Sequence, residues 1–200
     1  MRYKGTLLEH LADRVGLAQV NQQEQAAREI ISAAGYEGWI CKNTYSKNGS
    51  GCSDYLDKRV VKAVPYVGLG LGSQSFTHHS LSYNLGAVTK AADQYVASIK
   101  HNRIPIQDLY HLSQRAAMAK MISVSFYYGG IDLDAFFNCF GVQLNDVFAR
   151  EIEFVLQLGI MVYDPVLNRL QLTTLGKKHF GGVVALFYSP SAQEYVVNLE

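Results

Sequence analysis

The stretch Ile131–Gly141, IDLDAFFNCFG, decides the interpretation of the second half of the chain. Asp132 is a residue type that caps helix N-termini, and Asp134 is an acid suited to a first helical turn, where the helix dipole favours negative charge. Gly141 can adopt the left-handed conformation that ends many helices. The stretch therefore predicts a short helix over Asp132–Phe140.

The segments on either side predict further helices and a hairpin. Apolar residues in Leu144–Leu156 follow the i, i+3, i+4 spacing of an amphipathic helix, which Gly159 ends. The next segment, Gly159–Thr174, predicts a two-stranded hairpin, and a last helix is expected over Leu175–Tyr188. Upstream, a helix is expected from about Asp108 to Tyr127. Helices with a two-stranded wing are typical of a winged-helix-like domain.

The first half of the chain predicts a helix followed by strands. Asn21 can cap a helix with Glu24 three residues on and Gly35 as its stop. Gly38–Ser46 has the aromatic and β-type content of a strand, and the apolar run Tyr66–Leu71 suits a buried parallel strand. This order is typical of α/β architecture, but it supplies too few strands for a complete barrel or doubly wound sheet. We expect the closing part of a larger α/β domain.

A change in charge marks the expected domain boundary. Residues 1–105 carry twelve basic and eight acidic side chains, a net of +4, whereas residues 106–200 carry six basic and nine acidic, a net of −3. Pro105 supports a break because proline disfavours helix at the preceding residue and cannot donate in a central strand. We predict two domains, 1–105 and 106–200.

The composition limits the classes of protein to consider. Hydrophobic residues make up 48% of the chain and charged residues 18%, with a net charge of +1, which indicates a globular protein with no nucleic-acid or membrane partner. Three irregularly spaced cysteines, Cys41, Cys52 and Cys139, favour a reducing compartment. The sequence shows neither a signal peptide nor an apolar run long enough to span a bilayer. We expect a cytoplasmic location.

The most distinctive segment is the glycine-rich one, whose members are Gly68, Gly70, Gly72, Ser73 and Gln74. Alternating glycines leave the backbone open to a flat or anionic ligand, and they equally permit close packing of a neighbouring element. The spacing lacks the third glycine of the dinucleotide-binding fingerprint. Both explanations stay open.

Histidine and cysteine spacings do not indicate a metal site. His78 and His79 belong to no HExxH motif, and Cys41 and Cys52 have no second pair. We expect ordinary polar or surface roles for the histidines and no metal ligands among these residues. No serine, histidine and aspartate constellation follows from spacing, so the catalytic residues are unknown.

Four segments resemble, in this order, the closing part of the oxygen-independent coproporphyrinogen III oxidase family of radical S-adenosylmethionine enzymes. They are EQAAREIISAAGYEGW (Glu24–Trp39), YVGLGLGSQSF (Tyr66–Phe76), SFYYGGIDLDAFFNCFG (Ser125–Gly141) and LQLTTLGKKHF (Leu170–Phe180). The tail VVALFYSP looks closest to the branch involved in anaerobic haem utilisation. The resemblance implies an α/β fold: part of an incomplete radical-SAM β/α barrel over 1–105, then a mostly helical winged-helix-like domain over 106–200.

The resemblance also implies cofactors. The family uses S-adenosylmethionine and a four-iron four-sulfur cluster held by a CxxxCxxC loop. By this resemblance Gly68, Gly70, Gly72, Ser73 and Gln74 are the candidate S-adenosylmethionine contacts, although Gln74 departs from the family pattern. This sequence contains no CxxxCxxC, so the cluster ligands are absent from it.

The implied function is the carboxy-terminal portion of an enzyme that metabolises a tetrapyrrole, coproporphyrinogen or haem. Without the cluster motif we expect it to be inactive alone and to need a separate amino-terminal radical S-adenosylmethionine portion. The alternative is a non-catalytic haem or tetrapyrrole binding protein. DNA binding by a winged-helix-like domain is opposed by the net of −3 over residues 106–200.

Overall fold

The computed structural model describes residues 16–38, 45–47 and 53–198. The chain forms two compact units, Met1–Gly51 and Cys52–Glu200. Each unit is described by itself. Among the helices of the described ranges, none combines the length and the apolar character that a bilayer crossing requires.

The first unit contains helix α1 (Leu17–Ala33) and an antiparallel hairpin of β1 (Tyr36–Gly38) and β2 (Tyr45–Lys47). The expected helix start at Asn21 is wrong, because no helix breaker separates it from Gly16 and the helix extends back to Leu17. Gly35 ends the helix as expected, with a left-handed φ of +80°.

The single strand expected over Gly38–Ser46 is also wrong. Its described ends belong to two different strands, with Gly38 opposite Tyr45, and residues 39–44 lie outside the described residues. Antiparallel pairing joins neighbouring segments through a short connection, whereas a parallel strand would need a crossover.

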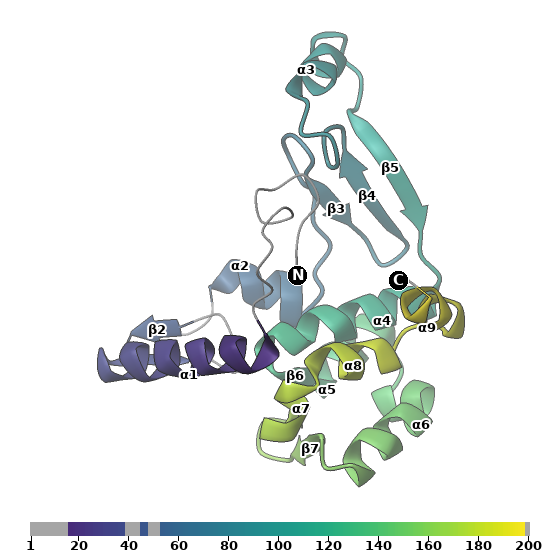
Figure 1. Ribbon diagram of the computed structural model, residues 1–200. Coiled ribbons are helices and arrows are strands. Elements are labelled where there is room, and N and C mark those ends of the chain that lie inside the picture. Colours follow the sequence, from purple (N-terminus) through teal and green to yellow (C-terminus); the bar gives the residue numbers. More distant parts are fainter. Residues whose placement is uncertain (1–15, 39–44, 48–52, 199–200) are drawn as a thin grey trace. The chain divides into compact units, whose positions relative to one another are not determined.

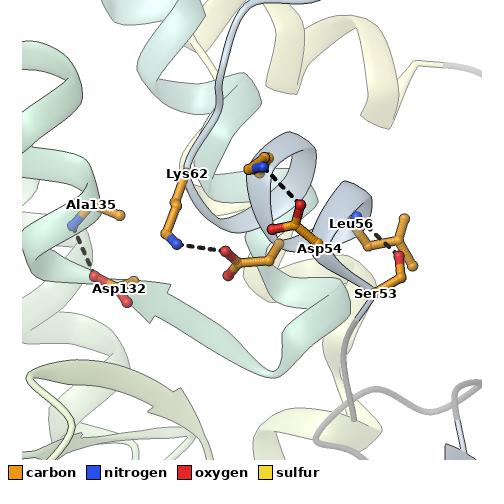
Figure 2. Close-up of polar contacts among 8 residues, drawn as sticks. Ser53, Asp54, Leu56, Lys62, Asp132 and Ala135 are labelled. Carbon is orange, nitrogen blue, oxygen red and sulfur yellow. Dashed lines mark hydrogen bonds and ion pairs between the residues drawn. The ribbon is translucent and has the colours of Figure 1, made fainter. Parts of the chain in front are cut away.

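The second unit begins with helix α2 (Asp54–Leu56), which continues into a π-helical turn, η2 (Asp57–Val61). The Ser53 hydroxyl accepts the Leu56 N–H at 3.2 Å and so caps the turn, as Figure 2 shows. Ion pairs of Asp54 with Lys58 at 2.7 Å and of Asp57 with Lys62 at 2.6 Å add to it.

A three-stranded antiparallel sheet follows, formed by β3 (Gln74–Phe76), β4 (Ser80–Asn84) and β5 (Ile106–His111) in that order (Figure 1). Helix α3 (Ala92–Lys100) lies between β4 and β5 in the sequence. The boundary at residue 105 stays a prediction, and it falls between two strands that pair in one sheet.

The expected buried parallel strand Tyr66–Leu71 is wrong. Tyr66 makes an isolated antiparallel bridge with Phe76, and the side chains of Val67 and Leu69 are 78% and 87% exposed. The chain leaves extended geometry at Gly70, whose φ is +108°, and therefore turns back towards β3 instead of entering a sheet. Every strand pair in the described ranges is antiparallel, so the predicted parallel sheet is absent from them, and they form no closed barrel.

The rest of the unit is mostly helical. It contains α4 (Gln114–Ser125), η3 (Phe126–Tyr128), β6 (Gly130–Asp132), α5 (Leu133–Phe140), α6 (Leu144–Gln157), β7 (Met161–Asp164), β8 (Arg169–Leu172), α7 (Thr174–Lys178), α8 (Phe180–Leu186) and α9 (Pro190–Val197). The strand order of its sheet is β6–β8–β7. Helices α5 and α6 and the β7–β8 hairpin confirm the predictions for this part.

Three details of this part differ from expectation. The helix expected from Asp108 starts at Gln114, because the segment before it pairs with β4 and Ser113 caps the helix. Strand β6 was not predicted. The last expected helix is interrupted at His179, whose φ of −105° and ψ of 22° are not helical.

The core of the second unit lies among α4, α5, α6 and α8 and the β6–β8–β7 sheet. Its largest fully buried side chains are Phe126, Phe136, Phe148, Phe187, Met121, Ile122 and Ile131. Phe76 and Ala63 join the same cluster, so β3 and the segment that follows η2 are attached to it by apolar packing. The fold is mixed α/β.

Candidate functional site

The glycine-rich turn is Gly68–Gln74, between the Tyr66 bridge and β3. Its backbone is held by side chains of the adjacent strands: the Gly68 N–H donates to Ser75 Oγ at 3.0 Å. The Asn84 side-chain amide donates to the carbonyls of Gly68 and Gly70 at 3.2 and 2.9 Å. Asn84 is itself buried, with 7% of its surface exposed. These contacts fix the shape of the turn without a ligand.

Close packing accounts for two of the three candidate glycines. A Cβ on Gly68 would lie 2.2 Å from the Gln74 carbonyl oxygen, and one on Gly72 would lie 3.0 Å from Ala87 Cα. At Gly70 the φ of +108° favours glycine, but a Cβ would meet only Ser73 Oγ, at 3.5 Å. The structure therefore brings these residues together, while S-adenosylmethionine contact stays a prediction for them.

The two polar candidates, Ser73 and Gln74, have partners within the turn and its sheet. Ser73 Oγ donates to the Leu69 carbonyl at 2.7 Å. Gln74 Oε1 accepts from the Tyr66 hydroxyl, and Gln74 Nε2 donates to the Tyr83 hydroxyl at 2.6 Å. The glutamine that departs from the family pattern thus positions two tyrosines.

Beside Tyr66 lies a cluster that the sequence did not suggest, which we call the cation–aromatic cluster: Arg59, Tyr66, Phe76 and Lys120. The Arg59 Cζ atom is 5.0 Å from the centre of the Tyr66 ring, and Lys120 Nζ is 4.0 Å from the centre of the Phe76 ring. The two rings are 6.0 Å apart. A cation therefore lies over each ring of an aromatic pair.

Burial and charge change the pKa of both cations. Desolvation, with a smaller contribution from the positive charge of Arg59, lowers the pKa of Lys120 to about 8. Hydrogen bonding to Tyr66 raises the pKa of Arg59, so its guanidinium stays charged. At neutral pH both groups are cationic. The sequence signal was a lone lysine in the apolar run AAMAKMI of α4, but its partners come from distant segments.

His78 and Cys139 form a second contact, with 3.3 Å between His78 Nε2 and Cys139 Sγ. The same Nε2 lies 3.0 Å from the Ala63 carbonyl oxygen, which only accepts, so Nε2 carries a proton in that hydrogen bond. His78 therefore offers the thiol no lone pair at Nε2, and desolvation raises the pKa of Cys139. The pair is not an activated thiolate. His78 thus has the ordinary polar role expected.

The residues present do not fit a four-iron four-sulfur cluster. Soft thiolates hold such clusters, and the sequence has three cysteines with ten and eighty-six residues between them. Cys41 and Cys52 lie outside the described residues. Within the described part of the chain, no group of three or more histidine, cysteine, aspartate or glutamate side chains could hold a metal ion.

Comparisons with known proteins identify a solved structure with a similar fold. No protein-family profile and no curated protein matches the sequence. Among solved structures, the chain is similar to coproporphyrinogen III oxidase (HemN) from Escherichia coli, described as a radical SAM enzyme. The match has a TM-score of 0.62 and 14% sequence identity, and it covers 88% of this chain and 42% of that one. Over most of its length the chain therefore has a fold that is found within HemN.

Proposed function

We propose that the chain is the carboxy-terminal portion of a radical S-adenosylmethionine enzyme that metabolises a tetrapyrrole, coproporphyrinogen or haem. The structural likeness to HemN over 88% of the chain carries this proposal, and the resemblance of four sequence segments to the same family supports it. The VVALFYSP tail favours the branch of that family involved in anaerobic haem utilisation as the one most similar to this chain.

The second part of the proposal is a winged-helix-like domain. Its support is the order of elements: helix, strand, helix, helix, strand, strand over α4, β6, α5, α6, β7 and β8, with the sheet order β6–β8–β7. The hairpin β7–β8 takes the place of the wing. In this proposal the domain supports a tetrapyrrole site and does not bind DNA.

The third part concerns the cofactors. Because the cysteines do not fit a four-iron four-sulfur cluster, we propose that a separate amino-terminal radical S-adenosylmethionine portion supplies the cluster, and that these 200 residues are inactive alone. S-adenosylmethionine would then lie between that portion and the glycine-rich turn.

Reconstitution with iron, sulfide and a reductant tests the cofactor assignment. We expect the desalted chain to retain no stable cluster, in both iron analysis and visible absorbance, because three thiols at these spacings do not form the family's ligand set. The Cys139→Ser variant should give the same background. A stable four-iron cluster in the wild-type chain would overturn this part of the proposal.

A further inference from the structure

The acidic residues next to Arg59 are already paired with other cations. The segment α2–η2 carries Asp54 and Asp57, which pair with Lys58 at 2.7 Å and with Lys62 at 2.6 Å. Figure 2 shows both ion pairs on this segment. No carboxylate of residues 53–198 makes an ion pair with Arg59 or Lys120. Besides desolvation, the charge of Arg59 lowers the pKa of Lys120, and the described chain supplies neither cation with a counter-ion.

The aromatic contacts do not use all the N–H donors of Arg59 and Lys120. Lys120 has three N–H donors, and its ammonium lies against the face of Phe76, which is 2% exposed. Arg59 uses Nη1 on the Tyr55 hydroxyl at 3.1 Å and lies over the Tyr66 ring. The rings of Tyr66 and Phe76 are tilted by 39° to each other, and Tyr66 is the half-buried member of the pair. Two cations beside a partly exposed ring suit a ligand that has an anionic group and an apolar body.

We propose that Arg59 and Lys120 bind an oxyanion, a carboxylate or a phosphate, carried by a ligand whose apolar body packs on the half-buried Tyr66. The site adjoins the glycine-rich turn, because the Tyr66 hydroxyl donates to Gln74 Oε1, and it requires no tetrapyrrole. The anion would relieve the repulsion between the two cations, and Tyr66 would add apolar contact. If the proposed function holds, one carboxylate of the tetrapyrrole is the natural occupant, and that assignment rests on the proposed function.

Linkage between protonation and anion binding gives a direct test. Helix α4 is in contact with η2, η3, β6, α5 and α8. The charged side chains of these elements are Asp57, Lys58, Arg59, Asp132 and Asp134, and of these Arg59 acts on the pKa of Lys120, which is about 8. An anion that prefers protonated Lys120 must raise that pKa, by about one unit for a tenfold preference.

The experiment follows the Lys120 side-chain carbon resonance against pH in the full chain labelled at lysine, assigned through Lys120→Met. Saturating benzoate or inorganic phosphate should move the midpoint upward from about 8, whereas neutral benzamide should leave it in place. A larger shift with benzoate identifies a carboxylate site, and a larger shift with phosphate identifies a phosphate site. An unmoved midpoint with both anions, or an equal shift with benzamide, would overturn the proposal.

Variants provide a second measurement on the same chain. Lys120→Met and Arg59→Gln should each weaken benzoate binding by about tenfold or more, which is the loss of one charge-assisted contact. Lys120→Arg should retain binding, and Lys178→Met, at an exposed lysine of α7, should leave it unchanged. Equal affinity in wild type and Lys120→Met would contradict the site.

Coproporphyrin III separates this proposal from the proposed function. If benzoate moves the Lys120 midpoint but coproporphyrin III does not bind, the anion site stands and the tetrapyrrole function fails. If coproporphyrin III binds wild type and Lys120→Met equally while benzoate moves the Lys120 midpoint, the tetrapyrrole function and the anion site both stand, and a tetrapyrrole carboxylate is not the occupant of that site.

Discussion

Phe148→Ala is expected to lower the free energy of unfolding by about 3–5 kcal/mol, the range for removing a buried phenylalanine. Phe148 is 0% exposed, and its ring lies 5.5 Å from that of Phe187. The Arg115 guanidinium stacks on it at 4.6 Å. The ring therefore connects α6 with α4 and with the end of α8, and its loss leaves a cavity among three helices. Urea unfolding followed by circular dichroism measures the change.

A matched control comes from the same helix. Phe154 in α6 is 47% exposed, so Phe154→Ala should change stability by no more than about 0.5 kcal/mol. If the two variants lost the same free energy, burial of Phe148 would not be the source of the effect, and the packing of α6 described above would be contradicted.

Gly68→Ala is expected to cost about 3 kcal/mol, the upper end of the range for overpacking. The added Cβ would lie 2.2 Å from the Gln74 carbonyl oxygen and 2.8 Å from the Gln74 carbonyl carbon. Both atoms are backbone, so relief requires the turn to move away from β3. Movement there would also break the contacts of Asn84 with Gly68 and Gly70. Denaturant unfolding measures the cost.

The control is Gly182→Ala in α8, where a Cβ would meet nothing within 4 Å. That change should stabilise the chain by about 0.5–1 kcal/mol, because alanine is the better helix former. Should Gly68→Ala unfold like wild type yet bind S-adenosylmethionine more weakly in the assembled enzyme, ligand approach and not packing would explain the glycine.

Local signals in the sequence predicted the carboxy-terminal half well. Asp132 caps α5, with its carboxylate accepting the Ala135 N–H at 2.8 Å, and Gly141 and Gly159 end α5 and α6 with positive φ (Figure 2). These signals depend on residues close together in the chain, so they can be recognised from the sequence without knowledge of the fold. The mixed α/β class agrees with the structure, although the two strands of the first half from which it was predicted are wrong.

Predictions that needed non-local pairing did not succeed. The run Tyr66–Leu71 has the apolar content of a buried strand, but its glycines let the chain turn back on itself. Strand β5 was expected to be the start of a helix, because its pairing with β4 involves residues more than twenty positions away. The cation–aromatic cluster combines positions 59, 66, 76 and 120, so no spacing rule could bring them together.

An equilibrium titration of the intact chain with coproporphyrin III, followed in the Soret band, tests the tetrapyrrole assignment most directly. We expect a saturable shift at micromolar concentrations that is lost when the chain is unfolded in urea. We expect haem to compete with coproporphyrin III if the haem-utilisation branch is the closer parent. A folded chain that leaves the Soret band of both compounds unchanged throughout the micromolar range would contradict the proposed function.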